Sequence, residues 1–276
     1  MNTYRQIFSR SLKGIAAFLF ALPLYLALVN VFKTEDQITR FPIALPTPFT
    51  LENIINVINR PDRLLFEGLT NSFLITACTV IAVVFFSSTI GFYIARSKAW
   101  YMRVLLLLFI AGMMVPAQVV LIPVSRMLNW MGLMGTFPGL ILLQTGGGLL
   151  SFAVFVYSGF VKTIPRELDE SAMIDGASRF TLFWRIIFPL MRPATATVVI
   201  FVSLWTWNEF LLPQIILGPG EGITITTGIF IAVDNLNINY GMAFALMFLS
   251  AIPILGFFFA LQKEFIAGLT GGSLKG

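Results

Sequence analysis

Six long apolar stretches dominate this chain and limit what it can fold into. They cover about residues 14–32, 69–95, 104–124, 138–161, 194–215 and 243–261. A helix needs about 20 mostly apolar residues to cross roughly 30 Å of hydrocarbon, and each stretch comes to about that length. Only 11% of the residues are charged, against roughly 25% in soluble domains. We therefore expect an all-α integral membrane protein with six transmembrane helices, which forms a single domain over residues 1–276.

Prolines and glycines interrupt two of these stretches. Pro116 and Pro123 lie in the third, and Gly146–Gly148 lie in the fourth. Membrane helices tolerate such residues where neighbouring groups satisfy the freed backbone. Both stretches are therefore still predicted to span, and Gly146–Gly148 to form a flexible or closely packed segment of a helix.

The residue inventory excludes several kinds of chemistry. The chain has no histidine and a single cysteine, Cys78, which lies within a predicted span. Catalysis by histidine and metal sites built on histidine or cysteine are therefore excluded. No G-x-x-x-x-G-K-[ST] motif occurs, so this chain cannot bind ATP through a P-loop. We expect no catalytic residue, no metal and no cofactor bound by this chain.

The positions of Lys and Arg predict the orientation in the membrane, because cytoplasmic loops carry an excess of them. Of the 18 basic residues, thirteen fall in the N-terminus, the 96–103 loop, the 162–193 loop and the tail, and five fall in the loops between. Both termini and the 162–193 loop are therefore predicted to be cytoplasmic. The net charge of +5 follows from this topology and gives no reason to expect a nucleic-acid partner.

The segment 165–190 is an acidic interruption in an apolar chain, and on this topology it faces the cytoplasm. Pro165 suits the first turn of a helix, and the acidic residues after it complement the positive end of the helix dipole. Gly176 falls within the predicted helix, where glycine costs about 1 kcal/mol relative to alanine, so we expect another backbone to approach it closely. Pro189 is expected to end the element. The residues alone leave two interpretations open, a connecting helix lying on the membrane and a helix that docks into the cleft of a partner.

A spaced motif in this segment carries a family resemblance. It reads Glu170-Ser171-Ala172, three residues, Gly176, nine residues, then Ile186-Ile187-Phe188-Pro189. It resembles the EAA loop of ATP-binding-cassette (ABC) importer permeases, with Ser171 in place of alanine and Phe188 in place of leucine. Further stretches are similar to the carbohydrate-uptake branch, in particular to the maltose-type permease subunit that lacks a large extra periplasmic domain: Thr50-Leu51-Glu52-Asn53, Asn71-Ser72, Met114-Val115-Pro116, Ile122-Pro123, Trp207-Asn208-Glu209 and the tail from Gln262 to Gly276.

The resemblance implies a role for the segment. In that family it forms a coupling helix in a cleft of the cytoplasmic ATPase subunit, and ATP-driven closure of the ATPase pair switches the permease from inward-facing to outward-facing. ATP and Mg²⁺ would then be used by the partner ATPase. The positions implied to couple to the ATPase are Glu170, Ser171, Ala172, Asp175, Gly176, Ile186 and Pro189.

The resemblance also implies partners and a location. A second, similar permease in a heterodimer, two ABC ATPase subunits and an extracytoplasmic sugar-binding protein would assemble with this chain. The assembly would lie in the cytoplasmic (inner) membrane of a prokaryote, in contact with its lipids.

Polar residues within the spans are the candidates for a substrate path. Glu209 is the one acidic residue inside a predicted span, and ionisable groups there are costly and usually face a cavity or a partner. Aromatic faces beside hydrogen-bonding groups suit a sugar; the other interpretation is an aromatic belt at the membrane interface with a glutamate that braces a subunit interface. The candidates are Trp205, Trp207, Asn208, Glu209, Gln118 and Gln144, of which the two glutamines equally suit helix–helix hydrogen bonds.

The resemblance thus implies a permease subunit of an ATP-driven importer that moves a sugar or oligosaccharide from an extracytoplasmic binding protein into the cytoplasm by alternating access. A permease for another solute, such as glycerol 3-phosphate, stays open. From other classes, an ion-coupled secondary transporter would need coupling-ion groups near the midplane, whereas the spans carry almost no carboxylates. The absence of histidine argues against a membrane enzyme.

Overall fold

The computed structural model describes residues 2–218, 222–234 and 239–273, and over these residues it is helical with no strand. The elements in chain order are α1 (Asn2–Val31), α2 (Glu35–Arg40), α3 (Glu52–Ile58), α4 (Leu64–Arg96), α5 (Trp100–Met113), α6 (Ala117–Trp130), α7 (Phe137–Gln144), the π-helical turn η1 (Thr145–Leu149), α8 (Leu150–Val161), α9 (Glu167–Ile174), α10 (Arg179–Thr181), the π-helical turn η2 (Leu182–Ile187), α11 (Phe188–Leu190), α12 (Arg192–Asn208), α13 (Leu211–Ile216), α14 (Ile225–Asp234) and α15 (Tyr240–Ser273).

Long apolar helices lie where the sequence predicted spans. Within the described residues, four helices are long and apolar enough to cross a membrane: Arg10–Val31, Leu64–Arg96, Phe137–Val161 and Tyr240–Ala260. Two sharply bent helix pairs raise the total to as many as six if each pair counts as one span: Trp100–Met113 with Ala117–Trp130, and Arg179–Leu190 with Arg192–Asn208.

Two of the predicted spans are divided between separate helices. α5 and α6 meet at 101°, because the ring of Pro116 disfavours helical backbone in the residue before it. The predicted span 194–215 is interrupted after Asn208, where Glu209 is extended (φ −67°, ψ 126°) and a separate helix begins at Leu211. Glu209 therefore lies at a break between two helices, which the prediction of a span over 194–215 did not include.

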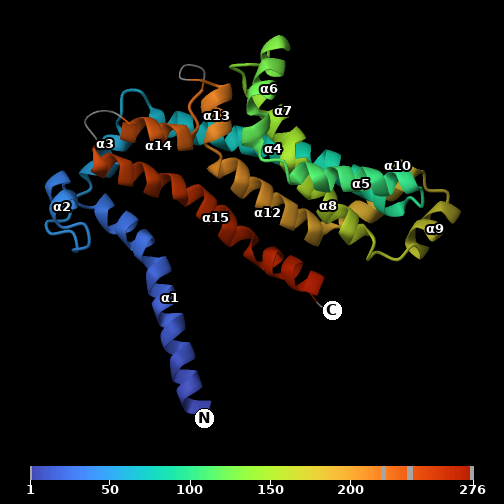
Figure 1. The fold of residues 1–276 in the computed structure, drawn as a ribbon, viewed down its shortest axis with the longest axis horizontal. Helices are drawn as coiled ribbons and strands as arrows, with labels where there is room; N and C mark the ends of the chain where they lie inside the picture. The colour runs from blue at the N-terminus through green and yellow to red at the C-terminus, as the bar shows by residue number, and fades with distance from the viewer. Residues whose placement is uncertain (1, 219–221, 235–238, 274–276) are drawn as a thin grey trace.

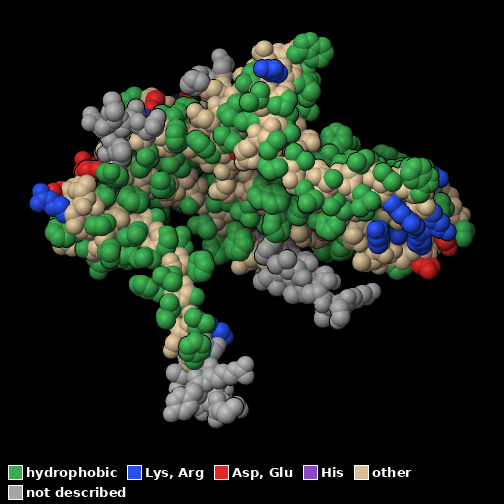
Figure 2. Space-filling view, in the orientation of Figure 1, with side chains coloured by type: hydrophobic (Ala, Val, Ile, Leu, Met, Phe, Trp, Pro, Cys, Tyr) green, Lys and Arg blue, Asp and Glu red, His purple; other side chains and the backbone are tan. Residues whose placement is uncertain are grey.

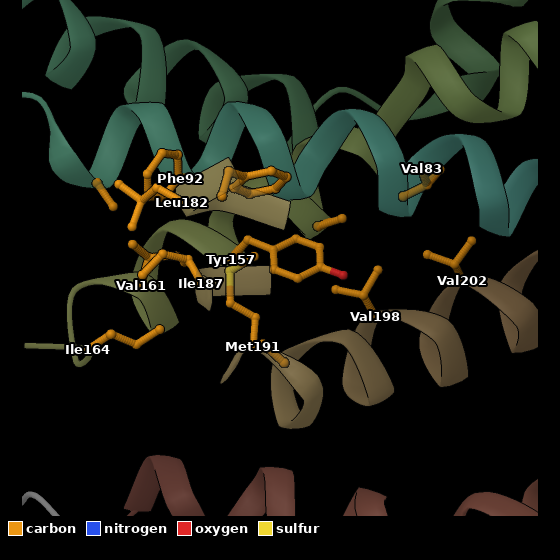
Figure 3. Packing of buried hydrophobic residues seen from close by; sticks show 14 of the residues in the cluster. Val83, Phe92, Tyr157, Val161, Ile164, Leu182, Ile187, Met191, Val198 and Val202 are labelled. Atoms are coloured by element: carbon orange, nitrogen blue, oxygen red, sulfur yellow. The ribbon is translucent and has the colours of Figure 1, made fainter. Parts of the chain in front are cut away.

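The core is built around α4, with α8 and α12 packed along it (Figure 1). Gly91 of α4 permits a close approach to α8, since a Cβ added there would lie 2.7 Å from the Cβ of Tyr157. The Tyr157 hydroxyl donates a hydrogen bond to Oγ1 of Thr195 in α12 at 3.0 Å. Figure 3 shows Tyr157 among buried side chains that include Val198 and Met191. These contacts hold the three helices at fixed positions relative to one another.

α1 stands apart from this core (Figure 1). It contacts α15, but Phe18, Phe20 and Leu24 are exposed along its length. Hydrophobic side chains also cover much of the visible surface of the molecule in Figure 2. Exposed apolar surface of this extent marks contact with a membrane or with another protein.

Candidate functional site

The acidic segment forms a short helix with a glycine beyond its end. α9 ends at Ile174, and Gly176 has φ +84°, a left-handed conformation that glycine adopts without strain. The Gly176 amide donates to the Met173 carbonyl at 3.1 Å. The Ala177 amide donates to the Ala172 carbonyl at 2.9 Å, and the two bonds together form the Schellman arrangement of a helix C-terminus. The prediction that Gly176 lies inside the helix is therefore wrong, because glycine terminates the helix here.

The coupling candidates on α9 divide between the surface and the core. Glu170, Ser171 and Asp175 are exposed, as is Gly176. Ala172 is buried in the main hydrophobic cluster of the chain, so its methyl group holds α9 against the body of the protein. It is not free to face a partner.

Two large apolar side chains near α9 are exposed, and neither was among the predicted coupling residues. Ile174 is 86% exposed at the end of α9, and Phe180 is 73% exposed in α10. Large apolar side chains left bare at one place point to a contact with another molecule. The available signal was a large aliphatic residue next to the acidic positions, which the EAA pattern does not single out.

The last two coupling candidates follow in a widened stretch of helix. Ile186 is half-buried in η2, and Pro189 is exposed within α11. Pro189 was predicted to end the element, yet the helix continues to Leu190 before the chain turns. A proline ring clashes with the carbonyl four residues earlier in a regular α-helix, and the π-helical turn before Pro189 relieves this clash by opening the ladder.

An ion pair at the base of α9 was also not predicted. Arg96, in the last turn of α4, places its Nε 2.6 Å from Oδ2 of Asp169 and donates from Nη2 to Oδ1 at 2.9 Å. Its Nη1 donates to the carbonyls of Val161 at 3.3 Å and Ile164 at 3.0 Å. One guanidinium thus connects the end of α4, the end of α8 and the first turn of α9. The two partners are 73 residues apart in the sequence, so no local pattern reveals them.

The substrate-path candidates meet at a second site, a pocket of about 700 Å³. Gln144, Trp205, Asn208 and Glu209 line it. Gln118 is exposed instead, and Trp207 is buried in a separate hydrophobic cluster on α4, α14 and α15. The structure therefore brings together four of the six candidates. The rest of the lining comes from the α5–α6 bend (Gly112, Met113, Val115, Ala117, Val120, Leu121, Val124), the α7–α8 junction (Leu143, Gly146, Gly147, Gly148, Leu149, Ser151, Phe152) and the α12–α13 break (Thr206, Phe210, Leu211, Leu212).

Glu209 and Gln144 are two polar residues of the pocket lining. Glu209 uses Oε1 to accept from the amides of Leu211 at 2.9 Å and Leu212 at 3.2 Å, which caps α13. Gln144 accepts at Oε1 from the Thr79 hydroxyl at 3.2 Å. Its Nε2, although buried, has no hydrogen-bond partner within the described part of the chain. A buried donor without a partner is costly.

The junction that carries Gln144 is bent. Gly147 leaves the helical conformation (φ −84°, ψ −147°) within η1, so α7 and α8 meet across a kink. No atom lies within 4 Å of a Cβ built on any of Gly146–Gly148. The glycines therefore leave open space at the pocket wall. Of the two alternatives predicted for them, a flexible or a closely packed helix segment, close packing is not met here.

Comparison with known proteins finds relatives along most of the chain. Residues 87–265 match the family described as binding-protein-dependent transport system inner membrane component. The multiple sugar-binding transport system permease protein MsmG of Streptococcus mutans is 33% identical over 95% of this chain and 94% of the relative. The melibiose/raffinose/stachyose import permease protein MelC of Bacillus subtilis is 31% identical over 96% of this chain and 95% of the relative. The probable starch degradation products transport system permease protein AmyC of Thermoanaerobacterium thermosulfurigenes is 30% identical over 95% and 94%.

A solved structure has a similar fold. It comes from a bacterial ABC transporter involved in the import of the acidic polysaccharide alginate. The TM-score is 0.85 at 19% identity, and the match covers 96% of this chain and 99% of that chain. At this identity the likeness concerns the fold alone.

Proposed function

The chain belongs to the family of binding-protein-dependent transport system inner membrane components, and from this premise we propose that it forms part of the path of a neutral sugar or oligosaccharide across the membrane. It is a permease subunit of an ABC importer in the inner membrane, and not an enzyme. It acts together with an ATPase and a substrate-binding protein. The cargo, the residues along its path and the contact with the ATPase are the subject of the proposal.

The chemistry of the 700 Å³ pocket supports a neutral sugar. Glu209 is its only charged residue among those described. Trp205 and Phe152 lie with their ring centroids 5.1 Å apart and offer aromatic faces for the apolar C–H faces of a sugar ring. Gln144 and Asn208 add neutral polar groups to the lining. An apolar pocket with a few placed polar groups is the usual form of a small-molecule site.

Anionic cargo fits this pocket poorly. A phosphate such as that of glycerol 3-phosphate is normally bound by Arg or Lys, and neither lines the pocket in the part of the chain described. Glu209 would repel such a group, and repulsion is strong where water is scarce. The names of three relatives refer to multiple sugars, to melibiose, raffinose and stachyose, and to starch degradation products, which agrees with neutral cargo.

α9 is proposed to dock on the ATPase, which uses ATP and Mg²⁺. Glu170, Ser171 and Asp175 offer polar contacts, Ile174 offers an apolar one, and Gly176 shapes the end of the helix. Ile186 packs partly buried against the main hydrophobic cluster and supports this surface from behind, while Pro189 is exposed in α11 and stays a candidate for the contact. Lys and Arg gather over the end of the molecule that carries α9 and α10 (Figure 2). This supports a cytoplasmic location for that end and, by the same topology, for both termini.

A second permease is proposed as the membrane partner in a heterodimer. The exposed apolar side chains of α1, among them Phe18 and Phe20, support a partner chain alongside lipid. Six crossings result if each bent helix pair spans once. Alternating access would then open the path between the two permeases to each side in turn.

Transport by the purified assembly tests this proposal. The chain is reconstituted in proteoliposomes with its companion permease, ATPase and binding protein, and uptake of labelled neutral and acidic oligosaccharides is measured with and without ATP. Trp205→Ala should lower uptake about fivefold, since one aromatic contact contributes about 1 kcal/mol. Trp100→Ala is the matched control, because Trp100 is exposed far from the pocket. Uptake of the acidic sugar alone, or no ATP dependence in the wild type, would overturn the proposal.

A further inference from the structure

α9 is held to the membrane helices by few buried side chains. Within α9, only Asp169 and Ala172 are buried. Ala172 contributes a single methyl group to the core, whereas Asp169 makes the two-point contact with Arg96. This ion pair is therefore the polar contact that joins α9 to α4 in the described part of the chain.

Stability alone does not explain an ion pair at this place. Both side chains are only 12% exposed, and replacing a buried pair by apolar residues of similar volume is often neutral or stabilising. What the pair provides is geometry, because a guanidinium is a rigid planar fork. The Arg96 guanidinium makes contacts on two sides: Nη2 donates to Asp169 of α9, with Nε 2.6 Å from the same carboxylate, and Nη1 donates to the carbonyls of Val161 and Ile164.

The other end of this connection is stiff. Arg96 ends α4, and Gly91, little more than one turn earlier, packs against Tyr157 of α8. Tyr157 in turn bonds Thr195 of α12, the helix whose far end carries Trp205 and the pocket. A movement delivered at Arg96 is thus passed to packed helices rather than absorbed in a loop.

We propose that Arg96 is a positioning residue that transmits the displacement of α9 to the α4–α8 pair, and that Asp169 is its contact on α9. This rests on the proposed docking of α9 on the ATPase. The consequence is specific: breaking the pair uncouples ATP hydrolysis from sugar movement while the assembly still forms.

The test is made on the complete reconstituted transporter with Asp169→Asn, Arg96→Lys and the apolar pair Arg96→Met with Asp169→Leu. Glu167→Gln is the matched control, since Glu167 is an exposed carboxylate on the same helix. Three quantities are measured: recovery of the ATPase with the permeases, the ATPase rate with and without loaded binding protein, and sugar taken up per ATP hydrolysed. We expect normal recovery of the ATPase for all variants. Asp169→Asn and the apolar pair should lose tenfold or more of the sugar moved per ATP. Arg96→Lys should show a smaller loss, and the control Glu167→Gln the smallest.

The outcomes separate positioning from a purely structural role. A structural pair would be replaced successfully by the apolar pair, so wild-type sugar per ATP in that double variant overturns the proposal. Failure of all three Arg96 and Asp169 variants to assemble would show that the pair serves folding, and would overturn it equally. If the wild-type assembly itself shows no ATP-driven uptake, the proposed function fails instead, whatever the variants do.

Discussion

Replacing Gly176 distinguishes two reasons for a glycine beyond α9. No atom lies within 4 Å of a Cβ built there, so alanine causes no clash inside this chain. A non-glycine residue held at the observed φ of +84° costs about 1–2 kcal/mol. Such an energy changes an equilibrium about 5–30-fold. Gly176→Ala should therefore reduce, by about that factor, the fraction of molecules in which the end of α9 has the conformation needed for docking.

Gly176→Asn is the informative comparison, because asparagine enters the left-handed region more readily than alanine. If the backbone conformation is the reason for glycine, the Asn variant should function better than the Ala variant even though its side chain is larger. If instead the ATPase backbone packs directly on Gly176, the larger side chain should do more damage and the order should reverse.

The assay combines three measurements. The affinity of the detergent-purified permease pair for its ATPase reports docking, and sugar uptake per ATP in proteoliposomes reports coupling. Hydrogen exchange at the amides of Gly176 and Ala177, both of which are bonded in the helix end, reports the local opening. The expected order is wild type, then Asn, then Ala, with the amides exchanging fastest in Ala. An Asn variant no better than Ala would refute the backbone argument.

Two further predictions follow from packing and charge. Gly91→Ala should destabilise the detergent-purified protein by about 1–3 kcal/mol and lower its thermal midpoint, since the new Cβ would lie 2.7 Å from that of Tyr157. The control Gly159→Ala should leave the thermal midpoint unchanged, because Gly159 has open space around an added Cβ. Hydrogen bonds from Arg60 hold the pKa of Asp62 below its ordinary value of 3.8. Their stabilisation is present above that value and lost as the pH falls through the lowered pKa, so Asp62→Asn should remove this part of the acid sensitivity of unfolding, measured from pH 6 down to pH 3; unchanged sensitivity would contradict it.

The membrane helices could be predicted because their signal is local. The predicted stretch 69–95 lies within α4 (Leu64–Arg96), and 138–161 coincides with Phe137–Val161. A run of about 20 apolar residues has few alternatives to crossing the membrane as a helix. Helix ends and breaks are harder to predict, because they depend on single residues whose effect competes with the helical preference of the residues around them.

The misplacement of Gly176 shows this competition. A glycine directly after the last helical turn is itself a helix-end signal, yet the prediction extended the helix through Gly176 and gave the glycine a packing role. The observed φ of +84° decides in favour of the turn. The contact of Arg96 with Asp169 was beyond prediction for a different reason, since it depends on how α4 and α9 meet in space.

The three irregular stretches of the membrane region have a common cause. Backbone outside regular helix is tolerated at membrane depth only where it is buried in protein or lines a cavity. The bend at Val115, the kink at Gly147 and the break at Glu209 are far apart in the sequence, and all three line the same pocket. Each was visible in the sequence as a proline, a run of glycines or an isolated carboxylate, but their convergence was not. That convergence is the stronger argument for a substrate path, because three independent helix interruptions that meet at one cavity would be costly to keep in a wall that served only to pack against lipid.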